Sequence, residues 1–133
     1  MDSTVIFIIE KDPAEGNLLT YHLQNEKFMN VQLFHSGGEC MRRIERGLVP
    51  DFIISDTHLP DMDGFTILEY LGNIKAGTRV IFFSPEEDQD LCHRLLKSGA
   101  SDYILRNPND INGITELVKN IRYLLKAGHP VEN

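Results

Sequence analysis

Four short apolar runs of this sequence are each followed directly by side chains that could do chemistry. The set combines carboxylates, a hydroxyl and cations, which suits an oxygen-ligated metal ion together with a phosphoryl group. If the runs are strands of one parallel sheet, the side chains that follow them share one rim and could act together. They are Glu10, Lys11 and Asp12 after residues 5–9, Ser55 and Asp56 after 52–54, Ser84 after 80–83, and Arg106 after 103–105.

The elements that must position these side chains are five apolar runs separated by helical patterns. The runs lack strict alternation, which is typical of parallel strands covered on both faces. Between them, apolar residues recur on one helical face, as Cys40, Ile44 and Leu48 do. Right-handed crossovers wind such a repeat into a doubly wound α/β fold with helices on both faces. We therefore expect five parallel strands, at residues 5–9, 31–34, 52–54, 80–83 and 103–105.

Helix ends are marked by residues with the expected local preferences. Glycines favour left-handed C-caps, proline favours the first helical turn, and Asp favours the N-cap. Residues 111–125 keep a helical period for about four turns, which predicts a docked C-terminal helix. The predicted marks are Gly47, Gly77 and Gly99 at helix ends, Pro13 and Pro85 at starts of helices or loops, Asp63 as a cap, and Asp12 in a solvated first helical turn favoured by the helix dipole.

Length and composition predict one soluble domain. The chain has 133 residues, of which 41% are hydrophobic and 25% charged, and one domain of this size can bury a sizeable core. No apolar run approaches the roughly 18–20 residues of a membrane span, and the start lacks a signal-peptide pattern. We expect a cytoplasmic protein with no membrane contact, formed by a domain over residues 1–127 and a tail or linker over 128–133.

Charge and the metal-binding residue types exclude other classes. The net charge of −7 disfavours direct nucleic-acid binding. Cys40 and Cys92 fall at apolar helix positions, so we interpret them as buried thiols rather than as a disulfide or metal ligands. The histidines lack zinc-site spacing and are expected at the surface; they are His22, His35, His58, His93 and His129.

The stretch from Asp51 to Gly64, DFIISDTHLPDMDG, resembles the acceptor strand and following turn of response regulator receiver domains. The segments 9–13 and 99–103 extend the resemblance over nearly the whole chain. It implies the flavodoxin-like, (βα)5 form of the predicted fold. It also implies that Asp56 accepts a phosphoryl group from a histidine kinase, a phosphotransfer protein or a small donor.

The resemblance implies a role for each residue of the rim. Mg²⁺ is held by Glu10, Asp56 and the backbone carbonyl of His58, while Ser84 and Arg106 hold the phosphoryl group. Tyr103 is the aromatic residue that couples the pocket to the surface of the last helices. The domain is then a signalling module rather than an enzyme, with an output protein or effector domain as its partner and pairing through the last helix as a further hypothesis.

Three residues depart from the family pattern. Lys11 stands where a second acidic metal ligand is usual, and a lysine about 4 Å from Asp56 would attract it by roughly 4 kcal/mol at an effective dielectric of 20. It should therefore weaken Mg²⁺ binding. Pro85 removes a backbone N–H donor for the phosphoryl group. Arg106 replaces a lysine, and the two cations differ in shape and hydration.

Several functional hypotheses remain open from sequence. The domain is either phosphorylated at Asp56 or is a phosphorylation-independent pseudo-receiver that presents a protein-binding face. The Asp61–Gly64 segment is also similar to the loop of haloacid-dehalogenase-like phosphatases, but it does not directly follow an apolar strand. A nucleotide- or flavin-binding module is disfavoured because residues 10–13 lack phosphate-cradling glycines.

Overall fold

Five parallel strands form one sheet in the computed structural model, which describes residues 3–107 and 111–127. The strand order is β2-β1-β3-β4-β5, and a helix follows each strand. The elements are β1 (Val5–Ile9), α1 (Pro13–Asn25), β2 (Asn30–Phe34), α2 (Gly37–Glu45), β3 (Phe52–Ser55), α3 (Gly64–Asn73), β4 (Arg79–Ser84), α4 (Gln89–Lys97), β5 (Asp102–Leu105) and α5 (Asn112–Ala127). The predicted fold is confirmed, with strand ends within one residue of the expected ones.

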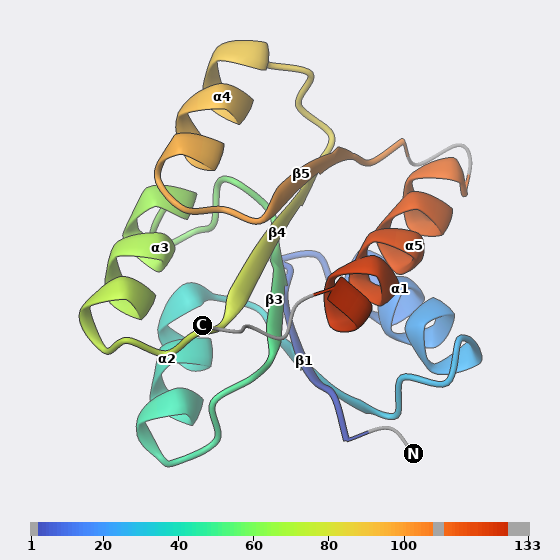
Figure 1. Ribbon diagram of the computed structural model, residues 1–133, viewed down its shortest axis with the longest axis horizontal. Coiled ribbons are helices and arrows are strands. Elements are labelled where there is room, and N and C mark those ends of the chain that lie inside the picture. Colours follow the sequence, from blue (N-terminus) through green and yellow to red (C-terminus); the bar gives the residue numbers. More distant parts are fainter. Residues whose placement is uncertain (1–2, 108–110, 128–133) are drawn as a thin grey trace.

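The two faces of the sheet are covered by different helices (Figure 1). Helices α1 and α5 lie on one face, and α2, α3 and α4 lie on the other. Successive residues of a strand point to opposite faces, so Ile6 and Ile8 pack under α1 and α5, whereas Phe7 and Ile9 pack under α2 and α3. Each such burial contributes about 1.5–3 kcal/mol, which explains why apolar runs without alternation form the strands.

The strand register brings the carboxyl ends of four strands to one edge. Ile9 of β1 pairs with Ser55 of β3, Ser55 pairs with Phe82 of β4, and Ser84 pairs with Leu105 of β5. The residues that follow β1, β3 and β5, together with Ser84, therefore gather at the same rim. The sheet alone fixes this neighbourhood, before any side chain of the site is considered.

Local capping starts and ends the helices, with Asp63 and the glycines in their predicted places and Asp12 as the N-cap rather than a residue of the first turn. Asp12 accepts a hydrogen bond from the Ala14 backbone N–H and begins α1, and Asp63 accepts one from Thr66 N–H and begins α3. After α2, α3 and α4, the glycines predicted as C-caps adopt positive φ, at 115° for Gly47, 71° for Gly77 and 115° for Gly99. The predicted tail over 128–133, which includes His129, lies outside the described residues.

The expectation of two buried thiols is confirmed for Cys40 but is wrong for Cys92. Cys40 is buried, whereas Cys92 is only partly buried, and both thiols are free. Burial raises the pKa of the Cys40 thiol to about 12 from an ordinary value of 9.0. Among residues 3–107 and 111–127, no helix has the length and apolar composition that crossing a bilayer requires.

Two glycines of α3 predict opposite effects of the same substitution. A Cβ on Gly64 would lie 2.6 Å from Cε1 of the fully buried Phe82 ring, so Gly64→Ala should lower the free energy of unfolding by about 1–3 kcal/mol. A Cβ on Gly72 meets nothing within 4 Å, so Gly72→Ala should raise it by about 0.4–1 kcal/mol. Urea unfolding measures both, and equal changes would contradict the packing described for α3.

The cysteines should differ in reactivity. In folded protein at pH 8, a thiol reagent should modify Cys92 within minutes and Cys40 at least about a hundredfold more slowly, since a buried neutral thiol is a poor nucleophile. The variants Cys40→Ala and Cys92→Ala assign each rate, and urea-unfolded protein provides the control in which both react alike. Fast modification of Cys40 in the folded chain would show that α2 does not pack as described.

Candidate functional site

Asp56 lies directly after β3, with a side chain that is 12% exposed. Its Oδ1 accepts a hydrogen bond from the Thr57 backbone N–H at 2.6 Å and a weaker one from the Thr57 hydroxyl at 3.4 Å. Its Oδ2 lies 3.8 Å from Nη2 of Arg106. One carboxylate oxygen is thus held by the following residue, while the other faces a cation across the rim.

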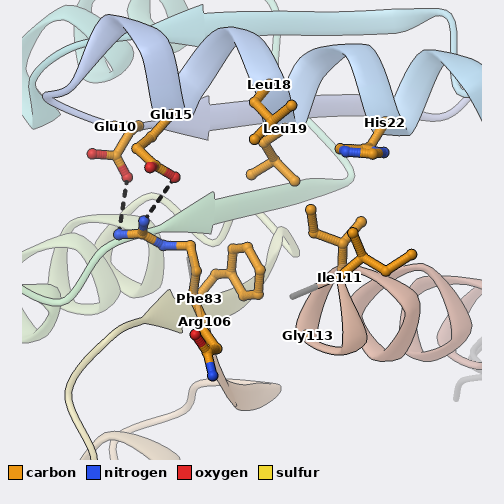
Figure 2. Close-up of a pocket in the computed structure, with 11 residues that line it drawn as sticks. Glu10, Glu15, Leu18, Leu19, His22, Phe83, Arg106, Ile111 and Gly113 are labelled. Carbon is orange, nitrogen blue, oxygen red and sulfur yellow. Dashed lines mark hydrogen bonds and ion pairs between the residues drawn. The ribbon is translucent and has the colours of Figure 1, made fainter. Parts of the chain in front are cut away.

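Arg106 is the cation at the centre of the rim. Its Nη1 donates a hydrogen bond of 2.9 Å to Oε1 of Glu15, and its Nη2 lies 3.6 Å from Oε1 of Glu10. Figure 2 shows the guanidinium between these two carboxylates. With Asp56, three carboxylates surround one guanidinium that is 15% exposed, which leaves the group with a net formal charge of −2. The arrangement can therefore accept further positive charge.

Glu10 is the most deeply buried carboxylate of this group. Its Oε2 accepts a hydrogen bond from the Asp12 backbone N–H at 3.1 Å, and its backbone carbonyl lies 2.9 Å from Nδ1 of His35. Burial raises the pKa of Glu10, although the Asp12 N–H and the Arg106 guanidinium partly oppose the rise. The negative charges of Asp56 and Glu15 raise it further, so the Asp12 N–H and Arg106 are the contacts that favour the ionised form of Glu10.

Lys11 does not occupy the place expected for it. Its side chain is exposed, and within the described part of the chain the ion pair of Asp56 is formed by Arg106. The physical reason is the turn after β1: Glu10 points into the rim, and the next residue faces solvent before α1 begins. The expectation that Lys11 neutralises Asp56 at about 4 Å is corrected, and Arg106 takes that role.

Ser84 belongs to a cluster of hydroxyls next to Asp56. It is fully buried at the end of β4, and its Oγ lies 3.4 Å from Oγ1 of Thr57 and accepts from the Glu86 backbone N–H at 3.1 Å. The Thr57 hydroxyl also donates to Oε1 of Glu86 at 3.1 Å. Ser84 and Asp56 are therefore joined through one intervening residue, as expected for groups of one site.

Tyr103 and Pro85 frame the loop after β4. The Tyr103 hydroxyl donates a hydrogen bond of 2.7 Å to the backbone carbonyl of Glu86, and partial burial raises its pKa. Pro85 is exposed and supplies no N–H, so the first amide available after Ser84 is that of Glu86, which already donates to the Ser84 hydroxyl. The aromatic ring thus holds the loop that lacks the family's usual donor.

The expected metal ligands only partly come together. Glu10 and Asp56 share the rim, but among the described residues no group of three His, Cys, Asp or Glu side chains could hold a metal ion. His58 is exposed, and its Nδ1 lies 3.8 Å from Oε1 of Glu86, which leaves its backbone carbonyl as the remaining candidate. Two carboxylates and a carbonyl suit Mg²⁺, which usually keeps several waters, but Arg106 competes for both carboxylates.

Sequence reasoning missed three residues of the site. Glu15 is an acidic residue in the first turn of α1. The helix dipole favours negative charge there, so the sequence gives no reason to assign it to a site. Thr57 and Glu86 are ordinary neighbours of the expected residues Asp56 and Ser84. The contact of Glu15 with Arg106 depends on how α1 packs on the sheet beside α5, and no spacing in the sequence signals it.

A cavity of about 180 Å³ adjoins the site between α1 and α5. Arg106 and the two glutamates line one part of it, and apolar side chains line the rest (Figure 2). The Arg106 guanidinium carbon lies 6.0 Å from the centre of the Phe83 ring, and its Nε is buried without a hydrogen-bond partner among the described residues. The stem of Arg106 thus crosses an apolar region, and its head is held by carboxylates.

Comparisons with known proteins agree with this geometry. Similar curated proteins include the regulatory protein VanRc of Enterococcus gallinarum, 28% identical over 127 residues, and the transcriptional regulatory protein CssR of Bacillus subtilis, 29% identical over 133 residues. The matches cover 96% and 98% of this chain but 54% and 56% of those relatives. The chain therefore spans about half the length of the curated relatives it matches.

Solved structures show the same fold. A two-component response regulator from Clostridium difficile superposes with a TM-score of 0.83 at 22% identity, over 96% of this chain and 100% of that one. The beryllofluoride-activated receiver domain of Klebsiella pneumoniae RstA gives 0.78 at 26% identity, over 92% and 99%. The family model of the response regulator receiver domain matches residues 6–119. This chain therefore belongs to the response regulator receiver domains of two-component systems.

Proposed function

We propose that this receiver domain accepts a phosphoryl group on Asp56 and thereby switches a protein-interaction face. The observation that carries the proposal is the setting of the Asp56 carboxylate, with Oδ1 held by Thr57 and Oδ2 facing Arg106. A carboxylate fixed in this way presents one oxygen to an incoming phosphorus atom. The nearby guanidinium offsets part of the negative charge that repels a phosphodonor.

In the proposed reaction, a carboxylate oxygen of Asp56 forms a bond to phosphorus as the bond from phosphorus to the donor breaks. The donor atom leaves with the bonding electron pair, as histidine nitrogen or acetate oxygen. Arg106 Nη2 and the Ser84 hydroxyl belong to neighbouring strand ends at this rim and would stabilise the equatorial oxygens. Ser84 turns its hydroxyl proton toward the phosphoryl group while its oxygen still accepts from Glu86.

Glu10, Asp56 and the carbonyl of His58 would hold Mg²⁺, which supplies charge stabilisation for the transferred oxygens. The net formal charge of −2 around Arg106 favours a divalent cation. The absence of a second acidic ligand at position 11 and the competing guanidinium make the affinity low. Receiver domains generally bind Mg²⁺ at this place, and here the binding should be weak.

The partners follow from the signalling role. A histidine kinase or phosphotransfer protein in the cytoplasm would deliver the phosphoryl group, and an output protein or effector domain would read the changed surface. The two curated relatives are regulators about twice as long as the matched part of this chain, which supports an effector role for the rest of such proteins. We extend the proposal to pairing of two domains through α5.

A pseudo-receiver is the second candidate function, and Arg106 is the observation that favours it. The guanidinium already lies among Glu10, Glu15 and Asp56, as an added cation would. The domain could then keep one conformation without phosphorylation and act as a binding module. Phosphorylation by acetyl phosphate separates this candidate from the first.

Incubation with acetyl phosphate and Mg²⁺ should add one phosphoryl mass to the native chain, because Asp56 is held and partly charge-neutralised. Asp56→Asn should remain unmodified. Asp90→Asn, which removes a surface carboxylate paired with Arg94 on α4, is the matched control and should be modified like the native chain. Intact-mass spectrometry reads all three, and an unmodified native chain would favour the pseudo-receiver.

Lys11→Asp should tighten Mg²⁺ binding by about tenfold, because it replaces a cation near the rim by an anion and so strengthens the attraction of the rim for a divalent cation. Lys27→Asp makes the same charge change after α1, away from the rim, and should have little effect. Titration followed by amide NMR shifts measures both affinities. Equal effects of the two variants would show that net charge alone sets the affinity and that no site exists at the rim.

A further inference from the structure

We propose that Glu15 is a positioning residue for Arg106, which it anchors so that Nη2 can contact the phosphoryl group on Asp56. The inference deepens the proposed function and rests on it. Glu15 touches none of the reacting atoms and acts through the guanidinium. The consequence is that α1 takes part in the phosphoryl-transfer site.

The anchor is visible in the contacts of the Arg106 head. The bond from Nη1 to Oε1 of Glu15 measures 2.9 Å, whereas Nη2 lies 3.6 Å from Glu10 and 3.8 Å from Asp56. Within the residues that the structure describes, the bond to Glu15 is thus the side-chain contact of Arg106 at hydrogen-bonding distance. Glu15 fixes the guanidinium, and the other two carboxylates attract it from farther away.

The two ends of the guanidinium serve different partners. Glu15 uses Nη1, while Nη2 faces both Glu10 and Asp56. Because each terminal nitrogen carries its own N–H groups, Nη2 can donate to a phosphoryl oxygen while Nη1 keeps Glu15. Nη2 lies 3.8 Å from Oδ2 of Asp56. A shift of about 1 Å would bring Nη2 within charge-assisted hydrogen-bonding distance of that carboxylate oxygen.

Glu15 is able to follow such a shift. Its side chain is 33% exposed in the first turn of α1, against 10% for Glu10, so it has more freedom to move with the guanidinium. Within the described residues, Nε of Arg106 has no hydrogen-bond partner, and the guanidinium carbon lies 6.0 Å from the centre of the Phe83 ring, so neither group fixes the direction of the terminal nitrogens. Without Glu15, the head would be held by long ion pairs alone and would sample several orientations.

A lysine at position 106 could not fill both roles in this way. Its single ammonium is a point charge, whereas a guanidinium presents two terminal nitrogens in a fixed plane. Arg106, which stands where the family has a lysine, and Glu15 on α1 therefore act together. Arg106 reaches from α1 to the acceptor Asp56, and Glu15 fixes the orientation of its guanidinium.

The test measures the initial rate of phosphorylation by acetyl phosphate, with Mg²⁺. It compares the native chain with two Glu15 variants, and compares the same two variants again in an Arg106→Lys background. Glu15→Ala removes the anchor and should slow the reaction by about five- to tenfold. Glu15→Gln keeps an acceptor oxygen at the same place and should stay within about twofold of the native rate. In an Arg106→Lys background the difference between the two Glu15 variants should vanish, since the bridging head is gone.

The matched control is the ion pair between Glu26, the C-cap of α1, and Arg122 of α5. Glu26 lies 3.1 Å from Arg122 at the far end of α1, so Glu26→Ala removes a similar pair away from the rim. It should leave the phosphorylation rate unchanged. Urea unfolding of each variant checks that rate differences do not follow stability.

Each other outcome overturns the inference in a distinct way. A Glu15→Ala rate equal to or above the native rate would mean that Glu15 does not position Arg106 or that it competes with Asp56. Equal slowing in Glu15→Ala and Glu15→Gln, or slowing that persists with Arg106→Lys, would assign the effect to charge or to α1 packing. If the native chain takes up no phosphoryl group while it folds normally, the proposed function itself fails, and this inference fails with it.

Discussion

The sharing of one guanidinium among three carboxylates is the interaction on which the site depends. Glu10, Glu15 and Asp56 come from the end of β1, the start of α1 and the end of β3, and Arg106 comes from the end of β5. Partly buried carboxylates repel one another and are costly to keep ionised without a cation. Arg106 therefore makes it possible for the parallel sheet to bring these acids to one rim.

The hydroxyl groups of the site lie beside a loop that lacks one backbone N–H, because position 85 is a proline. The Glu86 amide and carbonyl take over the ordering of the loop, through Ser84 and through the Tyr103 hydroxyl. A phosphoryl group on Asp56 would meet the hydroxyls of Ser84 and Thr57 and also Arg106, whose backbone N–H donates to the Ser84 carbonyl. The acceptor is thus next to both hydroxyl groups and a guanidinium, which are different kinds of donor for the phosphoryl oxygens.

The sequence predicted the fold well because local rules and burial agree in it. Apolar runs such as residues 5–9 and 80–83, the cap at Asp63 and the helix end at Gly99 each depend on a few neighbouring residues. The place of Asp56, Ser84 and Arg106 at one rim followed from parallel pairing alone. The contact of Glu15 with Arg106 and the outward direction of Lys11 could not be predicted, because they depend on how α1 packs against the sheet and on one turn of backbone after β1.

A crystal structure of the beryllofluoride adduct tests the central role of Arg106 most directly. The adduct places a phosphoryl mimic on Asp56, so the distances from both terminal nitrogens of Arg106 can be measured. We expect Nη2 within hydrogen-bonding distance of a fluoride and Nη1 still bound to Glu15. An adduct in which Arg106 turns to solvent while Lys11 contacts the fluorides would contradict the account.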